Sequence, residues 1–497
     1  MKNEGEVLKP RLHFSRTSHS MHLEKIKTPF NFIIFGASGD LAHLKIFPSL
    51  YELALQRRFP ENFSIYGYAR SKMTQAQFRK GFKASVKKYT EKILYNEKVI
   101  DELLEHVSYH QGQYDHEEDF QHFAEKLMEV QENKKVYNLA FFATPPLVTQ
   151  EIVGNLAKIR KKLGGKLDLM LEKPFGENRK SAGKLFQWIT NHFEKENLFL
   201  IDHYLGKSAV RSIFPLRYNN TILNLLLKGH AISNIQISAL ETIGVEERIG
   251  FFENVGIIKD MIQSHLLQVL GLLTMSMPVN QEVRSIGREK GDVISGLRQD
   301  KKGGIVLGQY QDYKSQPGVK ANSKTPTFAA IRLFIDLAEW YQVPIYIRSG
   351  KKMSHKHTYI VIEFKKPPYV KTSEIDPNRL IIELHPKENI QIKLVNDLGK
   401  EVPQRNELLT EESLACMGDD CLSPYANLIL DGFLKRYGSF LSIDEILASW
   451  HFIDSVHENI EKNKIKIISY ESNSKGPEQQ EQLTALDGNQ WYDVKHL

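Results

Sequence analysis

The stretch NFIIFGASGDLAHLKIFPSLYELAL, residues 31–55, decides the fold. It begins with a short apolar run, passes through a turn that holds Gly36 and Gly39, and then enters a helix-forming segment. That order predicts a buried strand, a glycine-rich turn and a helix. A helix N-terminus at such a turn offers unpaired N–H groups and a positive dipole to a phosphate. The spacing is G-x-x-G and lacks the full G-x-G-x-x-G fingerprint, so a glycine turn without a ligand stays the alternative.

Further apolar runs of strand length follow, separated by helix-like polar stretches, and they end in Gly, Pro or charged residues. They span residues 63–70, 135–146, 167–176 and 197–204. Continuously apolar strands that alternate with helices favour a parallel sheet covered on both faces. We therefore predict an N-terminal, Rossmann-like α/β dinucleotide-binding domain over residues 31–205.

The pattern changes after residue 205, where apolar runs succeed one another with long helices only in places. These runs include NIQISALET, GIVLGQYQDY, VPIYIRSGK, TYIVIEFKK and RLIIELHPKENIQIKLV. They predict a larger α+β domain with a mostly antiparallel sheet over residues 206–497. A chain of 497 residues has room for two such domains.

The N-terminal thirty residues have a different character, with six Lys or Arg against three acids. They contain no apolar core of the kind that a secretory signal needs. We expect residues 1–30 to form a mobile N-terminal arm.

Composition excludes several classes of protein. No apolar run reaches about 18 residues, so we expect no membrane span. The net charge of +6 is compatible with an anionic small molecule and does not by itself indicate nucleic acid. The two cysteines, Cys416 and Cys421, are few for the length of the chain, which indicates a reducing compartment and a cytoplasmic protein. We expect two reduced thiols, with a local redox pair as the alternative.

The end of the second predicted strand bears on the choice of coenzyme. An NAD-preferring fold usually places an acid there to bind the ribose 2′-hydroxyl. In this chain GYARSK puts Arg70 and Lys72 at that place, which favours a 2′-phosphate and therefore NADP. Lys45, just after the first glycines, would add another cation. Each base taken alone could equally be a solvated surface side chain.

Polar residues gather where two later strands end, the edge at which open α/β sheets bind ligands. Glu172-Lys173-Pro174 follows one strand, and Asp202-His203-Tyr204 with Lys207 follows the next. A further histidine, His265, lies among apolar residues at helical spacing. Taken alone, it is more typical of a buried, hydrogen-bonded histidine than of a catalyst.

Seven motifs, in order and spacing, resemble the glucose-6-phosphate dehydrogenase family. They are IIFGASGDLA, GYARSK, LEKPFG, IDHYLGK, GFFENVGIIKDMIQSHLLQ, VPIYIRSGK, and LILDGF followed by DEILASW. The E-K-P segment also occurs in sugar dehydrogenases like glucose–fructose oxidoreductase, which are the structural alternative. The resemblance implies oxidation of glucose 6-phosphate at C1 to 6-phosphogluconolactone, the first step of the oxidative pentose phosphate pathway. It also implies NADP as coenzyme, and a homodimer or homotetramer in which residues 206–497 bind substrate and form the oligomer. We expect no metal, because hydride transfer from an alcohol can proceed with a base alone and the sequence shows no cluster of metal ligands.

The resemblance further assigns roles to individual residues. His265 would be the base, and Asp202 its carboxylate partner. The residues that would hold substrate are Lys173, His203, Tyr204, Lys207, Glu241, Asp260, Lys351 and Lys356. Those that would hold the coenzyme are Gly36, Ser38, Gly39, Asp40, Lys45, Arg70, Lys173 and Pro174.

Some positions depart from the family. Lys356 stands where some members have Arg, and His385 where some have Gln, which leaves substrate affinity open.

The competing hypotheses are an NADP-responsive binding protein with negligible turnover and a basic nucleic-acid binder, for which we find no recognition motif.

Overall fold

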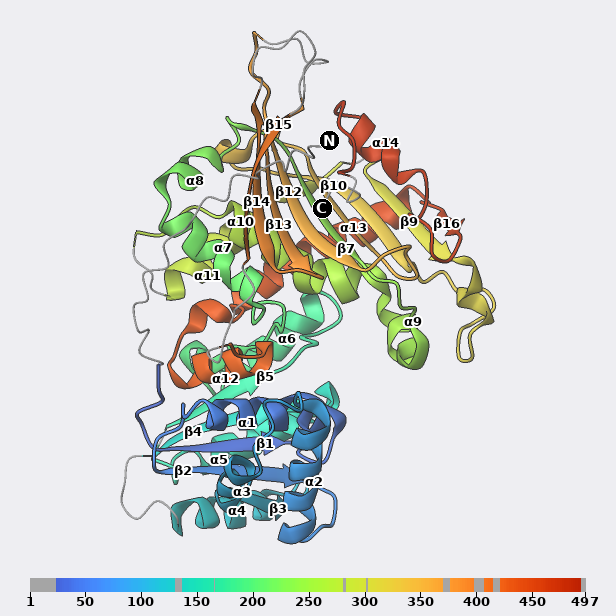
Figure 1. The fold of residues 1–497 in the computed structure, drawn as a ribbon. Coiled ribbons are helices and arrows are strands. Elements are labelled where there is room, and N and C mark those ends of the chain that lie inside the picture. The colour runs from blue at the N-terminus through green and yellow to red at the C-terminus, as the bar shows by residue number, and fades with distance from the viewer. Residues whose placement is uncertain are drawn as a thin grey trace, which may run out of the picture.

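A computed structural model describes most of the chain (Figure 1). The described residues are 24–129, 136–164, 166–279, 283–300, 303–369, 376–396, 406–413 and 421–492. A small sheet with helices on both faces lies at one end of the molecule, and a large curved sheet flanked by helices lies at the other (Figure 1).

The small sheet has six parallel strands in the order β3-β2-β1-β4-β5-β6. The strands are β1 (Phe30–Phe35), β2 (Phe63–Ala69), β3 (Val107–Gln111), β4 (Tyr137–Phe142), β5 (Leu167–Leu171) and β6 (Leu198–Leu200). β1, β4 and β5 are buried at every position, which accounts for their continuous apolar sequences. The Rossmann-like prediction is confirmed. The edge strand β3, with the less apolar sequence VSYHQ, was not predicted.

Helices cover both faces of this sheet. They are α1 (Phe47–Leu55), α2 (Gln75–Tyr89), α3 (Glu97–Glu105), α4 (Glu117–Glu129), α5 (Thr149–Ile159) and α6 (Arg179–Thr190). Alternate residues of β1 enter two different apolar clusters, because successive side chains of a strand point to opposite faces. Phe32 and Ile34 pack with α1, α2 and α3, whereas Ile33 and Phe35 pack with α4 and α5.

The large sheet has ten strands, with β8 paired to β10 outside the main order β15-β14-β13-β12-β7-β11-β10-β9-β16. The strands are β7 (Ile232–Leu240), β8 (Leu297–Gln299), β9 (Ile305–Tyr310), β10 (Phe328–Ile335), β11 (Ile345–Gly350), β12 (His357–Phe364), β13 (Arg379–His385), β14 (Asn389–Asn396), β15 (Asn406–Ser413) and β16 (Ile467–Tyr470). Its pairings are antiparallel except β7–β11 and β9–β16, so the predicted mostly antiparallel sheet is confirmed.

The remaining helices connect and flank the two sheets. They are α7 (Ser208–Tyr218), α8 (Thr221–Leu226), α9 (Ile249–Ile257), α10 (Leu267–Thr274), α11 (Val283–Ser295), α12 (Pro424–Phe433), α13 (Ile443–Lys462) and α14 (Gln480–Ala485). Two wide π-helical turns, η1 (Ala42–Ile46) and η5 (Ile258–Leu266), carry predicted site residues. No described helix has the length and apolar character needed to cross a membrane.

Helix α12 comes late in the sequence but packs on the first sheet. The Phe433 ring lies 4.1 Å from that of Phe30 and 5.7 Å from that of Phe32, both on β1. We call residues 421–441 the return segment, because they bring the chain back from the large sheet to the small one. A bridge between Leu200 on β6 and Leu441 ends this segment. The late part of the chain therefore completes the core of the N-terminal half.

Of the predicted N-terminal arm, residues 1–23 lie outside the described residues. The part nearer β1 is packed: Ile26 is 3% exposed, and its N–H donates to the Arg58 carbonyl at 2.8 Å.

The expectation of two reduced thiols is wrong for Cys421, which is disulfide-bonded. Cysteine count reports the compartment only statistically, and a local pair can form when its loop folds back. Cys416 lies outside the described residues.

We predict that Phe433→Ala lowers the stability of the protein by about 3–5 kcal/mol, because it leaves a cavity between α12 and β1. Phe433 is 8% exposed, whereas Leu147 is 90% exposed, so Leu147→Ala is the matched control and should change stability by less than about 0.5 kcal/mol. Urea unfolding followed by tryptophan fluorescence measures both. Equal midpoints for the two variants would show that the return segment does not stabilise the first sheet.

Candidate functional site

A cavity of ≈ 790 Å³ lies where the small sheet meets η5 and the large sheet. Eight of the predicted site residues line it: Lys173, Pro174, His203, Tyr204, Glu241, Asp260, His265 and Lys351. Asp202 lies behind its wall with 1% exposure. The structure thus gathers residues spread over nearly 180 positions of sequence around one space.

The register of two parallel strands places the first charged pair. Leu171 of β5 is paired with Leu200 of β6, and Lys173 and Asp202 each lie two residues further on. Both side chains therefore emerge at the same carboxyl edge of the sheet. The Lys173 ammonium donates to Asp202 Oδ2 at 2.8 Å and to the Ser264 carbonyl at 2.5 Å.

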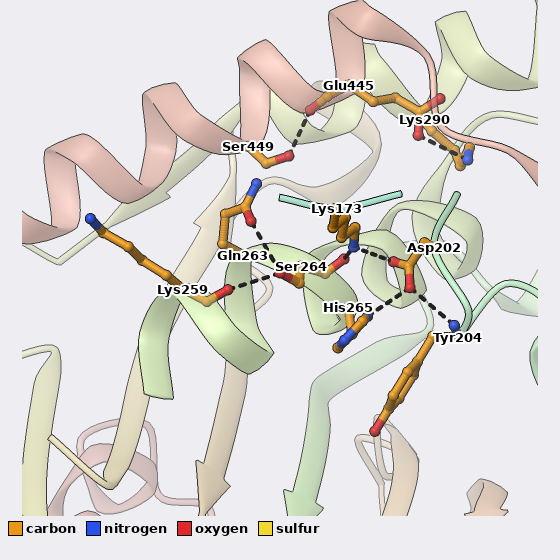
Figure 2. Close-up of polar contacts among 10 residues, drawn as sticks. All are labelled: Lys173, Asp202, Tyr204, Lys259, Gln263, Ser264, His265, Lys290, Glu445 and Ser449. Atoms are coloured by element: carbon orange, nitrogen blue, oxygen red, sulfur yellow. Dashed lines mark hydrogen bonds and ion pairs between the residues drawn. The ribbon is translucent and has the colours of Figure 1, made fainter. Parts of the chain in front are cut away.

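His265 reaches the same carboxylate from η5. Its Nδ1 lies 2.7 Å from Asp202 Oδ1, and its other ring nitrogen is turned away from Asp202 (Figure 2). The wide turn begins just after Gly256, whose φ of 64° breaks the preceding helix α9 and lets the chain change direction. His265 is 7% exposed, so it is a buried, hydrogen-bonded histidine and also part of the cavity wall.

The protonation states of Asp202 and His265 follow from their burial and from the charged groups next to them. Burial alone would raise the pKa of Asp202, but His265 and Lys173 hold that pKa well below its ordinary value. Burial lowers the pKa of His265 below its ordinary value of 6.5, while Asp202 pulls it upward. Near neutral pH the arrangement is therefore an ionised carboxylate bonded to a neutral imidazole. Such an imidazole can accept a proton on its far nitrogen, and the carboxylate then stabilises the charge.

Tyr204 and His203 form a wall beside this imidazole. The Tyr204 ring stacks on His265 with 4.2 Å between centroids, and the Tyr204 N–H donates to Asp202 Oδ1 at 3.0 Å. The His203 ring lies 4.8 Å from His265, edge to face. Burial, and after it the neighbouring His265, lowers the pKa of His203 to about 3. His203 is therefore neutral at physiological pH and can both donate and accept a hydrogen bond.

One predicted substrate lysine, Lys207, lies against Tyr204, and a second, Lys356, is an electrostatic neighbour of Lys207. The Lys207 ammonium lies 3.9 Å from the Tyr204 ring centroid. Burial lowers the pKa of Lys207, Glu388 opposes that shift, and the exposed Lys356 adds to it. Neither lysine lines the cavity proper. A buried cation with a second cation near enough to lower its pKa favours an anion beside it.

The large sheet supplies a second charged pair by the same register logic. Gly350 of β11 pairs in parallel with Leu240 of β7, so the next residues, Lys351 and Glu241, emerge together. They form an ion pair, and Asp260 on η5 lies 3.7 Å from Lys351.

Arg248, which the sequence does not single out, joins Asp260 at 3.1 Å and lines the cavity. It comes from a short helical turn that carries no motif, so no sequence pattern marks it.

The predicted coenzyme turn lies at the end of β1. Gly36 has φ +81°, and a Cβ there would lie 2.4 Å from the Ala143 carbonyl oxygen, so only glycine fits. The Gly39 N–H donates to the Gly36 carbonyl at 2.9 Å, and Ser38 Oγ lies 3.0 Å from Ser71 Oγ. The compact backbone leaves room for a phosphate to approach, which fits a dinucleotide.

The charged members of the coenzyme set surround this turn on the surface. Asp40, Lys45 and Arg70 are all exposed. The Arg70 guanidinium lies 5.4 Å from the Tyr114 ring centroid, a cation–π contact that restricts its position. These residues lie outside the lining of the cavity, so the coenzyme set and the substrate set occupy separate regions joined by Lys173 and Pro174.

One atom each of Asp202, His203 and His265 lies within 4.8 Å of the others, a spacing open to a metal ion. Both oxygens of Asp202 are already engaged, by His265 and Tyr204 on one side and by Lys173 on the other. A lysine ammonium so close disfavours a divalent cation. The sequence-based expectation of no metal stays a prediction.

Comparison with known proteins covers nearly the whole chain. The family models "Glucose-6-phosphate dehydrogenase, NAD binding domain" and "Glucose-6-phosphate dehydrogenase, C-terminal domain" match residues 33–212 and 214–492. The Arabidopsis thaliana "Glucose-6-phosphate 1-dehydrogenase 3, chloroplastic" is 34% identical over 93% of this chain and 80% of its own length. "Glucose-6-phosphate 1-dehydrogenase 5, cytoplasmic", also from Arabidopsis thaliana, is 34% identical over 92% of this chain and 91% of its own. The solved "Glucose-6-phosphate dehydrogenase in complex with its substrate glucose-6-phosphate" has a TM-score of 0.85 at 30% identity, over 94% of this chain and 99% of that one.

Proposed function

The chain belongs to the glucose-6-phosphate dehydrogenase family, and from that membership we propose that His265 and Asp202 are its catalytic pair. It oxidises D-glucose 6-phosphate at C1 to 6-phospho-D-glucono-1,5-lactone with NADP, in the pentose phosphate pathway. The observation that supports the catalytic assignment is the 2.7 Å contact between His265 Nδ1 and Asp202 Oδ1 beside the cavity.

His265 acts as the general base. Its far ring nitrogen takes the proton of the C1 hydroxyl while C1 loses a hydride, so the C1–O bond becomes the carbonyl of the lactone. Asp202 stays ionised, fixes the orientation of the imidazole and stabilises the imidazolium that forms. When bound, NADP accepts the hydride at C4 of its nicotinamide.

The other cavity residues hold and orient the sugar phosphate. The phosphate takes hydrogen bonds from His203 and Tyr204, and positive charge from Lys207 and Lys356, which lie outside the cavity lining. Glu241 and Asp260 accept hydrogen bonds from sugar hydroxyls, and Lys351, which pairs with both, fixes their positions. Lys173 holds Asp202 and the Ser264 carbonyl, and it contacts both sugar and coenzyme.

The coenzyme binds along the carboxyl edge of the small sheet. The backbone of Gly36, Ser38, Gly39 and Asp40 holds the diphosphate, and Pro174 supports the nicotinamide. Arg70 and Lys45 provide positive charge for the 2′-phosphate. The exposed position of Arg70, held over Tyr114, supports this role.

We predict that His265→Asn lowers kcat/KM for glucose 6-phosphate by about 10²–10⁴-fold, because it removes the base. The Asn amide keeps a donor toward Asp202. NADP reduction followed at 340 nm measures the loss, with His192→Asn, at an exposed histidine, as control. For the wild type, activity should be lost only below pH 6.5, as the lowered pKa of His265 is crossed and the imidazole becomes protonated. Turnover within tenfold of wild type in the variant would contradict the assignment.

We predict that Arg70→Ala raises KM for NADP by about 10- to 100-fold, since it removes a charge-assisted hydrogen bond to the 2′-phosphate. KM for NAD, which lacks that phosphate, should change by less than about twofold. Lys80→Ala makes the same change of charge at an exposed position of α2 and is the control. If Arg70→Ala weakened the binding of NADP and NAD equally, Arg70 would contact a part of the coenzyme that both share and not the 2′-phosphate.

We also propose a domain boundary near residue 205, a cytoplasmic location, and a homodimer or homotetramer. Ile222, Leu225 and Leu226 of α8, which are 42–72% exposed, support an oligomer because large apolar side chains gathered on a short helix favour burial. We predict that sedimentation velocity gives a mass two or four times the 57.3 kDa of one chain. A single species of one chain at micromolar concentration would refute this.

A further inference from the structure

Four charged side chains form a row along one wall of the cavity. Glu241 forms an ion pair with Lys351, which lies 3.7 Å from Asp260. Asp260 in turn pairs with Arg248 at 3.1 Å. All four residues line the cavity, and the sign of the charge alternates along the row. The first three have a proposed role in holding the sugar, whereas Arg248, at the end of the row, has none.

The Asp260 carboxylate depends on Arg248 for its orientation. Lys351 hydrogen-bonds to Glu241, and its Nζ is 3.7 Å from Asp260 Oδ2, too far for a hydrogen bond. Arg248 Nη2 donates to Asp260 Oδ1 at 3.1 Å. A charge-assisted hydrogen bond restricts the direction of both partners, whereas attraction over a longer distance does not. Arg248 is therefore the cation that fixes how this carboxylate is turned.

Arg248 is itself held in place by helix α9, which it precedes. Its guanidinium lies 5.5 Å from the ring centroid of Phe251, a cation–π contact. The helix is tied to the rest of the large domain through Glu253. The Tyr313 hydroxyl donates to Glu253 Oε2 at 2.6 Å, and the Thr325 hydroxyl donates to the Glu253 carbonyl at 2.8 Å. The donor that reaches Asp260 therefore comes from an anchored element.

Stability of the fold does not account for this contact. The Arg248 side chain is 58% exposed and that of Asp260 is 11% exposed. An ion pair with so exposed a member contributes little to stability, because solvent screens it and a long side chain has to be ordered. The geometry of the site is what the contact changes.

We propose that Arg248 is a positioning residue for the substrate: it holds the Asp260 carboxylate in the orientation in which Asp260 accepts a hydrogen bond from a sugar hydroxyl. This inference rests on the proposed role of Asp260 in binding the sugar. Arg248 acts on the substrate through Asp260 and makes no contact with the substrate phosphate.

The test measures kcat and the KM values for glucose 6-phosphate and NADP in wild type, Arg248→Met and Arg248→Lys. Methionine keeps an unbranched apolar stem and removes the donors, whereas lysine keeps the charge and loses the planar fork. We expect Arg248→Met to raise KM for glucose 6-phosphate about three- to tenfold, with Arg248→Lys between it and wild type. KM for NADP and kcat should each change by less than about twofold.

A double-mutant cycle with Asp260→Asn shows whether Arg248 acts through Asp260. Asp260→Asn should itself raise KM for glucose 6-phosphate. In that background Arg248→Met should add less than about twofold, because the group that Arg248 positions is already changed. Inorganic phosphate, which has no sugar hydroxyl, is a second probe. Its inhibition constant against glucose 6-phosphate should be the same in Arg248→Met as in wild type.

Arg288→Met is the matched control. Arg288 is also an exposed arginine that donates to a carboxylate, that of Glu289 at 3.2 Å, but it lies outside the cavity lining. Its loss should leave KM for glucose 6-phosphate unchanged. If Arg248→Met raised KM equally in wild type and in Asp260→Asn, or weakened inhibition by phosphate, Arg248 would contact the substrate directly and the proposal would be overturned.

Two further outcomes separate this inference from the assignment on which it rests. KM unchanged in Asp260→Asn would refute the substrate role of Asp260, and the inference with it. KM raised in Asp260→Asn but not in Arg248→Met would refute the role of Arg248 alone. Failure of the catalytic pair would appear instead as turnover retained by His265→Asn.

Discussion

The buried carboxylate of Asp202 is the interaction on which the rest of the site depends. It accepts hydrogen bonds from Lys173 after β5, from His265 on η5 and from the N–H of Tyr204. A charge with 1% exposure is strongly unfavourable unless it is paired and hydrogen-bonded on every side. Because its partners come from both halves of the chain, the need to satisfy this one group fixes how η5 lies against the small sheet.

The same geometric rule operates twice in the molecule. Residues that follow two paired parallel strands emerge side by side, so an acid and a lysine placed there form an ion pair without any special loop. Lys173 with Asp202 in the small sheet and Lys351 with Glu241 in the large sheet both arise in this way. The large sheet is mostly antiparallel, and of its two parallel pairs β7–β11 is the one whose following residues, Glu241 and Lys351, line the cavity. Hairpin-connected strands would have carried these two residues to opposite ends.

The sequence predicts what depends on local pattern. Fully buried strands such as β1 and β5 are continuous apolar runs, and the polar residues that end them are visible as motifs. Periodicity alone leaves His265 as a core histidine, since the residues around it are apolar at helical spacing; only the family resemblance joins it to Asp202, 63 residues away. The hydrogen bond between Tyr425 on α12 and Glu172, which follows β5, could not be predicted, because it depends on the return segment crossing from one sheet to the other. Cysteine count alone favours reduced thiols over a local pair, so the disulfide state of Cys421 is established only by the structure.

The proposed reaction needs two adjacent groups in opposite states of protonation. The proposed base His265 has to be neutral before the reaction, which burial favours, while Asp202 has to be ionised, which burial opposes. Lys173 resolves the conflict, because its charge stabilises the carboxylate from the side away from the imidazole. Burial lowers the pKa of Lys173 as well, and Asp202 raises it. Each of the two groups therefore favours the charged form of the other. Removing Lys173 would therefore disturb the protonation state of the proposed base without any direct contact with it, so we propose that the strand-end pair of Lys173 and Asp202 serves catalysis as well as the fold.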